Sequence, residues 1–123
     1  MPRTEVIAYR EADGSVPLVD WLDGLSQMAR EKCLVKIEML VESGHELRRP
    51  HCDLLERGIW ELRARAGHVQ YRILYFFHGQ NVVILSHGFS KERYVPGTEI
   101  EKAVRRRECY LQNPSAHTYE GYI

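Results

Sequence analysis

The stretch GIWELRARAGHVQYRILYFF, residues 58–77, decides the fold. It contains two runs rich in Trp, Ile, Val, Tyr and Phe around a short Ala-Gly-His break, a pattern typical of a β-hairpin that buries apolar side chains. Because side chains alternate between the faces of a strand, Arg63 and Arg65 share one face of the first strand, whereas Trp60, Leu62 and Ala64 share the other. This pattern raises the question of what the arginine face does.

The number of residues in the hairpin turn decides where the arginines meet. With an even number, Arg65 pairs with His68 or Gln70, and in both registers Arg63 and Arg72 share a face. The pairing with Gln70 places Arg63 directly opposite Arg72. Facing guanidinium groups repel each other, but a phosphate bound between them would relieve the repulsion. A three-residue turn would instead separate the two arginines onto opposite faces.

The alternative explanation is an ordinary solvent-exposed strand face, on which one arginine pairs with Glu61. The distribution of charge gives additional information. The chain of 123 residues has no net charge, yet residues 1–44 carry five basic and eight acidic side chains, and residues 45–109 carry twelve basic and eight acidic ones. The sequence is therefore unlike a general polyanion binder, and any anion site is expected in its second half.

The hydrophobic periodicity predicts helices and strands around this hairpin. We expect strands at residues 5–10, 58–66, 69–77 and 81–89, and helices at residues 15–25, 26–44 and 98–111. Ser15 is expected to cap the first helix, and Thr98 with Glu101 forms a capping box for the last one. Residues 45–57 are expected to form a polar loop.

This element order predicts an α+β fold, β-α-α-β-β-β-α. An antiparallel sheet of about four strands would carry two N-terminal helices on one face, and the C-terminal helix would partly cross the other. We expect one domain, residues 1–111, followed by a tail, residues 112–123, that contains Pro114 and no usable period. The tail is expected to be mobile.

The composition of the chain predicts the cellular compartment and the state of the cysteines. No segment has the length and apolarity of a signal peptide or a membrane span, so we expect a cytoplasmic protein that does not contact a membrane. Three widely spaced cysteines predict reduced thiols. His45, His51 and Cys52 could supply three metal ligands without a fourth, but an ordinary polar loop is the preferred interpretation, and no metal or cofactor is expected.

Three segments together resemble a known family. GIWELRARAGHVQYRILYFF, VVILSHGFSKERYVP and TEIEKAVRRRECY are similar to the phage-associated HigB-like branch of the RelE/ParE toxin superfamily, over roughly residues 55–110. The resemblance implies an mRNA-cleaving toxin that acts mostly at the ribosome. It also implies neutralisation by an antitoxin, usually a helix-turn-helix protein, within a toxin–antitoxin hetero-oligomer. ParE-like relatives with the same fold instead poison DNA gyrase, so the fold does not fix the function.

The resemblance also implies roles for individual residues. Arg63 and Arg65 match basic residues on the strand before the hairpin turn, Arg72 matches the arginine of the Tyr-Arg strand, and Lys91 matches the basic residue after the last strand. The branch often has a second lysine after Lys91, where this chain has Glu92 followed by Arg93. We expect Arg93 to replace it.

Metal-independent RNA cleavage requires activation of the ribose 2′-OH, stabilisation of charge on the phosphate and protonation of the leaving 5′-oxygen. Arg63, Arg72 and Lys91 suit charge stabilisation, although they are poor bases. His87 is the first candidate for proton transfer because imidazole titrates near neutrality, with burial in the core as the alternative. Glu61 could be a base or an ion-pair partner of Arg63.

Weaker candidates complete the predicted site. His51 and Tyr94 are further options for proton transfer. Arg65, Arg93, Arg49 and Arg106 are the predicted RNA-binding residues; Arg106 belongs to a run of three arginines that could equally be a solvated helix face. A DNA gyrase inhibitor and a phage-derived binding module without catalysis remain the competing functions.

Overall fold

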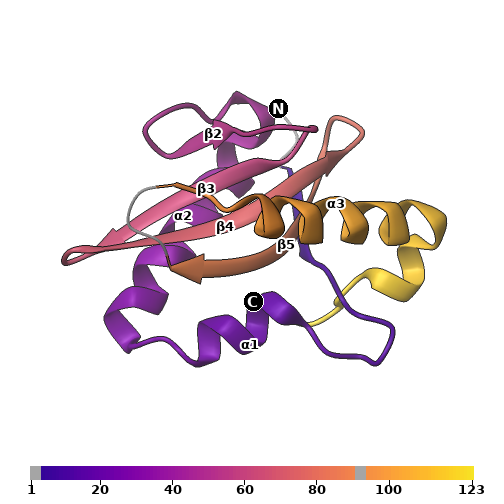
Figure 1. The fold of residues 1–123 in the computed structure, drawn as a ribbon, viewed down its shortest axis with the longest axis horizontal. Coiled ribbons are helices and arrows are strands. Elements are labelled where there is room, and N and C mark those ends of the chain that lie inside the picture. The colour runs from indigo at the N-terminus through magenta and orange to yellow at the C-terminus, as the bar shows by residue number, and fades with distance from the viewer. Residues whose placement is uncertain (1–3, 91–93) are drawn as a thin grey trace.

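A computed structural model gives the fold, and it describes residues 4–90 and 94–123. Five strands form one sheet and three α-helices pack on it (Figure 1). The strands are β1 (Glu5–Ala8), β2 (Cys52–Leu54), β3 (Trp60–Ala66), β4 (Val69–His78) and β5 (Val82–Ser90). The helices are α1 (Pro17–Asp23), α2 (Gln27–Ser43) and α3 (Gly97–Gln112), and 3₁₀ turns lie at Gly44–Glu46 and Pro114–His117.

The predicted α+β class is confirmed, with one more strand than expected. The sheet order is β1-β5-β4-β3-β2, in which only β1 and β5 run parallel. The additional strand, β2, lies inside the segment that we expected to be a polar loop. Its three residues pair with Trp60, Glu61 and Leu62 at the edge of the sheet.

Each face of the sheet contributes to a separate hydrophobic core. On one face, Leu62, Ile73 and Leu85 pack with Leu18 of α1 and Leu40 of α2. The other core joins residues of the opposite sheet face, Leu74, Phe76 and Ile84, to the α3 residues Ile100, Ala103, Val104 and Tyr110. In Figure 1, α2 lies behind the sheet and α3 crosses in front of it.

The helix ends differ in part from the expectation. Ser26 caps α2, because its side chain accepts a hydrogen bond from the backbone N–H of Ala29. The capping box at Thr98 is wrong: α3 begins earlier, at Gly97, and Pro96 precedes it without a side-chain cap. The cap at Ser15 is also wrong, since Val16 is the capping residue and the Ser15 hydroxyl donates to Asp13.

The C-terminal tail folds back along β1. The backbone N–H of Tyr119 donates to the carbonyl of Ala8 at 3.0 Å, and the ring of His117 stacks on that of Tyr9. Tyr119 and Ile123 pack against the core beneath α1 and α2. The mobility of this tail stays a prediction.

Candidate functional site

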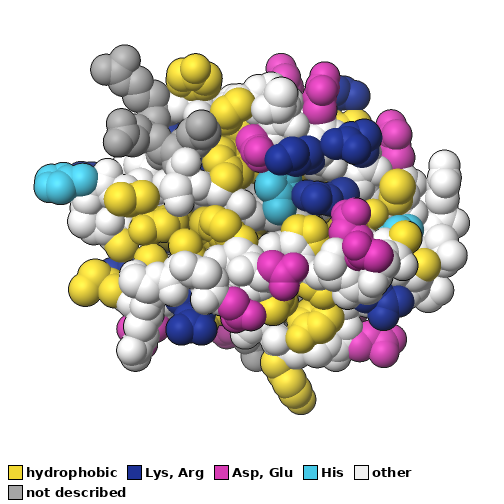
Figure 2. Space-filling model, turned by 60° about the horizontal axis from the view of Figure 1, so that its bottom comes forward, with side chains coloured by type: hydrophobic (Ala, Val, Ile, Leu, Met, Phe, Trp, Pro, Cys, Tyr) yellow, Lys and Arg dark blue, Asp and Glu magenta, His cyan; other side chains and the backbone are white. Residues whose placement is uncertain are grey.

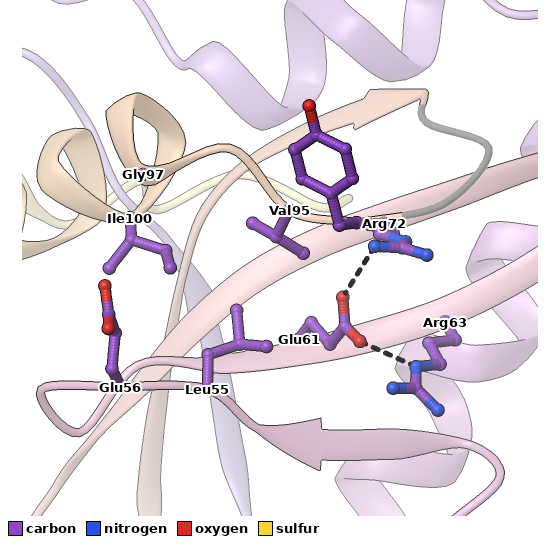
Figure 3. Close-up of a pocket in the computed structure, with 9 residues that line it drawn as sticks. Leu55, Glu56, Glu61, Arg63, Arg72, Val95, Gly97 and Ile100 are labelled. Atoms are coloured by element: carbon purple, nitrogen blue, oxygen red, sulfur yellow. Dashed lines mark hydrogen bonds and ion pairs between the residues drawn. The ribbon is translucent and has the colours of Figure 1, made fainter.

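A groove opens on the α3 face of the sheet, next to the start of the helix (Figure 3). Its volume is about 480 Å³. Residues from β3, β4, the loop before β3 and the segment leading into α3 line it: Leu55, Glu56, Glu61, Arg63, Arg72, Tyr94, Val95, Gly97 and Ile100. The groove therefore contains four of the residues considered for the site from the sequence, Glu61, Arg63, Arg72 and Tyr94.

The strand register brings the two arginines together. The hairpin turn has two residues, Gly67 and His68, and Gly67 adopts a left-handed φ of 61° that suits a tight hairpin. Arg65 consequently pairs with Gln70, and Arg63 lies directly opposite Arg72. Of the turn lengths that the sequence left open, the structure has the even one, in the register that pairs Arg65 with Gln70.

Glu61 lies between the two guanidinium groups. Its Oε1 accepts a hydrogen bond from Arg63 Nε at 2.7 Å, and its Oε2 lies 3.6 Å from Arg72 Nη1. Only 1% of Glu61 is exposed. Because a buried carboxylate between two cations offsets their repulsion, the arginine pair is stable without a bound anion. Glu61 is thus held as an ion-pair partner, which favours a positioning role over that of a free base.

A second carboxylate extends this cluster toward the sheet edge. Asp53, opposite Glu61 on β2, accepts a hydrogen bond from Arg63 Nη2 at 3.1 Å and two from Arg49 at 3.0 Å each. The Arg49 hydrogen bonds hold the pKa of Asp53 below its ordinary value. Arg63 is consequently fixed from two sides while a third of its side chain stays exposed. Arg49, predicted to bind RNA, is solvent-exposed at the end of this cluster.

The sequence of this chain matches one known protein family. Residues 20–108 match the family described as Phage derived protein Gp49-like (DUF891), which covers most of the chain. The chain belongs to this family. The Gp49-like family is part of the RelE/ParE-like toxin clan. No curated protein matches the chain.

In this member of the Gp49-like family, His87 lies outside the groove. It is buried in β5, where its Nδ1 lies 2.8 Å from the Ser86 hydroxyl and its Nε2 lies 3.1 Å from a carboxylate oxygen of Glu99 on α3. Burial, with the nearby cation of Arg106, lowers the pKa of His87 to about 4. The ring is consequently neutral at pH 7, as in the core-histidine alternative.

The remaining predicted residues are dispersed. Arg65 is exposed at the hairpin and donates to the carbonyl of Gly67, whereas Arg106 pairs with Glu11 and lies 5.9 Å from the centre of the Tyr9 ring. His51 contacts Lys36 of α2, so its ring is turned away from the groove. Lys91 and Arg93 lie outside the described residues.

The surface charge does not form one continuous basic area on the face shown in Figure 2. Lys and Arg side chains there lie among Asp and Glu side chains, next to a broad hydrophobic area. Within residues 4–90 and 94–123, no group of three His, Cys, Asp or Glu side chains is placed to hold a metal ion, and no helix could span a membrane.

Five lining residues were missed by sequence reasoning: Leu55, Glu56, Val95, Gly97 and Ile100. Leu55 and Glu56 belong to the loop that was treated only as polar, and Ile100 was assigned to the core. Asp53 was missed as well, because its role depends on β2, a strand of only three residues. The one sequence signal for a strand here was the alternation of the polar Asp53 with its neighbour Cys52, which is buried.

Proposed function

We propose that this chain is the toxin of a type II toxin–antitoxin system, of the HigB-like branch, and that it cleaves mRNA without a metal ion. The opposed pair of Arg63 and Arg72 at an open groove is the observation that carries the proposal. Membership of a family in the RelE/ParE-like toxin clan supports it. The substrate would be mRNA on the ribosome.

In the proposed reaction the arginine pair binds the scissile phosphate. Guanidinium groups donate paired hydrogen bonds to phosphate oxygens and stabilise the charge that develops during in-line attack by the 2′-OH. Preorganisation is the contribution of Glu61 and Asp53, which fix the position of Arg63 before substrate arrives. Lys91 is proposed as a third cation, and Arg93, Arg65, Arg49 and Arg106 as contacts to RNA.

Proton transfer requires groups other than the arginine pair. An arginine stays protonated at neutral pH, so the base and acid must come from elsewhere. His87, the first candidate from the sequence, is a poor source, because burial lowers its pKa to about 4 and it lies outside the groove. The other source is the ribosome, whose RNA can position the mRNA so that cations alone suffice.

Neutralisation by a cognate antitoxin, a helix-turn-helix protein, is part of the same proposal. The antitoxin would form a hetero-oligomer with the toxin and prevent mRNA from reaching the arginine pair. Its gene is expected next to that of the toxin.

Controlled expression in a bacterium tests the function. Wild-type protein is expected to arrest growth and to generate new mRNA ends in primer extension, with plasmid topology unchanged, and the neighbouring gene should suppress both effects. Arg72→Ala should abolish cleavage, whereas Lys32→Ala, on the exposed side of α2, should retain it. Because Arg72 is buried, Arg72→Lys serves as a second variant that keeps the charge and is expected to fold.

The competing functions predict other outcomes. Altered plasmid supercoiling with intact mRNA would identify a DNA gyrase inhibitor. An absence of growth arrest from well-folded wild-type protein would identify a binding module without catalysis. Either result contradicts the proposal.

A further inference from the structure

The groove changes chemical character along its length. Figure 3 shows Arg63 and Arg72 at one end, Glu56 and Ile100 at the other, and Leu55 and Val95 between them. A cationic end, an apolar middle and a carboxylate end occur in this order. A ligand that matches it has an anionic group, then a flat apolar group, then a hydrogen-bond donor.

Glu56 supplies a free acceptor at a fixed place. Its side chain is exposed, and within the described part of the chain no hydrogen bond or ion pair holds its carboxylate. The backbone of its loop is nevertheless fixed: Ile59 N–H donates to the Glu56 carbonyl at 3.1 Å, and Arg107 Nη1 donates to the carbonyl of Arg57 at 2.6 Å. The backbone that carries Glu56 is thus fixed, and its carboxylate is open to a ligand.

Tyr94 supplies an aromatic surface at the same groove. Its side chain is 70% exposed, whereas Tyr75 is buried among aromatic neighbours in the core. An exposed aromatic ring next to cations is the arrangement by which single-stranded nucleic-acid binders stack unpaired bases. The apolar side chains of Leu55, Val95 and Ile100 extend this surface into the groove.

We propose that the groove binds one unpaired nucleotide, with its phosphate on Arg63 and Arg72 and its base against Tyr94, and that Glu56 selects the base. The proposal rests on the RNA-cleaving function proposed above and adds a base preference to it. The groove volume of about 480 Å³ lies in the range of small-ligand sites, roughly 300–1,000 Å³.

The carboxylate determines which bases fit. Adenine, cytosine and guanine carry an exocyclic amino group that can donate to Glu56. Uracil carries carbonyl oxygens in the corresponding positions, on both sides of its single N–H, and these oxygens repel a carboxylate. Cleavage is therefore expected to disfavour uridine at one fixed position next to the cut.

Mapping of mRNA ends across the cell after induction tests this preference. For wild-type protein we expect uridine to be depleted about tenfold at that position, a discrimination typical of one hydrogen-bonded base contact. The side-chain amide of the Glu56→Gln variant can both donate and accept a hydrogen bond. For this variant we expect uridine at its background frequency at the same position. Glu120→Gln, an exposed carboxylate of the tail, is the matched control and should keep the wild-type pattern.

Tyr94 is tested in the same cells. Tyr94→Ala should reduce cleavage at all sites about tenfold without changing the base preference, because stacking tolerates every base. Tyr94→Phe should cleave like wild type. Tyr122→Ala is the matched control, since Tyr122 is fully exposed and lies outside the groove.

Two negative outcomes are distinguishable. If wild-type protein cleaves mRNA but shows no discrimination against uridine, or if Glu56→Gln keeps the wild-type pattern, the base-selection proposal is wrong and the cleavage function stands. If wild-type protein generates no new mRNA ends, the proposed function is wrong and the base preference fails with it. Growth arrest by Glu56→Gln would show that this variant folds.

Discussion

Two guanidinium groups that face each other need a countercharge, and Glu61 provides it inside the protein. We expect Glu61→Gln to lower the free energy of unfolding by about 3 kcal/mol, because it leaves Arg63 and Arg72 opposed around a neutral amide. Urea denaturation measures this change. Arg49→Ala removes only an exposed partner of Asp53 and should change the stability little. Equal stability of Glu61→Gln and wild type would contradict the ion-pair role.

His87 makes the stability depend on pH. Its folded pKa of about 4 lies below the ordinary value of 6.5, so the unfolded chain binds more protons between these values. Stability is therefore fully present above about pH 6.5 and is lost as the pH falls toward 4, by about 1 to 3 kcal/mol. Glu99 faces the ring, with the cations of Arg106 and Lys102, and its own lowered pKa acts in the same direction at lower pH.

Denaturation curves at several pH values check the His87 prediction. His87→Gln should remove the loss of stability between pH 6.5 and 4. His68→Gln, at the exposed hairpin turn, should keep that loss. A pH profile of His87→Gln that matches wild type would show that other groups cause the dependence.

The same His87 variant separates a structural from a chemical role. Because the ring lies outside the groove, we expect His87→Gln to keep cleavage per folded molecule nearly unchanged. Primer extension, corrected for the folded fraction, measures it. A loss of about 100-fold with unchanged stability would instead assign proton transfer to His87.

At the scale of single residues, the sequence offered the opposed pair of Arg63 and Arg72 as one of its alternatives, but it did not give the partners that site residues find on other elements. The opposition of Arg63 and Arg72 follows from strand alternation and a two-residue turn, both local properties. The partners of His87 do not, because Glu99 and Arg106 reach it from another element. Asp53 likewise joins the cluster only through the pairing of β2 with β3.

Secondary-structure elements were predictable where a period ran over many residues. The hairpin and α2 are of this kind. The strand β2 is too short for a period, and its place at the sheet edge is set by tertiary pairing. The capping box failed because α3 starts at Gly97, one residue before the predicted cap, while Glu99 is engaged by His87 and Lys102.

The contact of α1 with β5 depends on a glycine. A Cβ on Gly88 would lie 2.2 Å from the Trp21 ring, and this bulky ring is packed beside Tyr71. Gly88→Ala is therefore expected to lower the free energy of unfolding by about 1 to 3 kcal/mol through overpacking. Thermal melting measures it.

The control for Gly88 is a glycine in open space. Nothing lies within 4 Å of a Cβ built on Gly97, so Gly97→Ala should leave the melting midpoint nearly unchanged. Similar melting of the Gly88→Ala protein and wild type would mean that α1 shifts easily over the strand. The groove lies on the other side of the sheet from Gly88 and should be unaffected by Gly88→Ala.

At the scale of the whole molecule, the two faces of the sheet differ in how completely the helices cover them. The face under α1 and α2 holds the larger core, and the tail closes that core along β1. The opposite face is only partly covered by α3, which leaves the groove beside the helix start. Sequence periodicity predicted this partial cover, but it could not place the tail, whose contacts join residues more than 100 positions apart.

Deletion of the tail after Gln112 tests its part in the fold. The deletion removes the stacking of His117 on Tyr9, the hydrogen bonds of Arg10 to Ala116, and the packing of Tyr119 on the core. From the apolar side chains uncovered, we expect a loss on the order of 3 kcal/mol, or roughly 10 °C in the melting midpoint. Cleavage should persist below that midpoint, because no residue of the tail lines the groove. Unchanged melting would show instead that the tail is mobile, as its sequence predicts, and that the fold ends with α3.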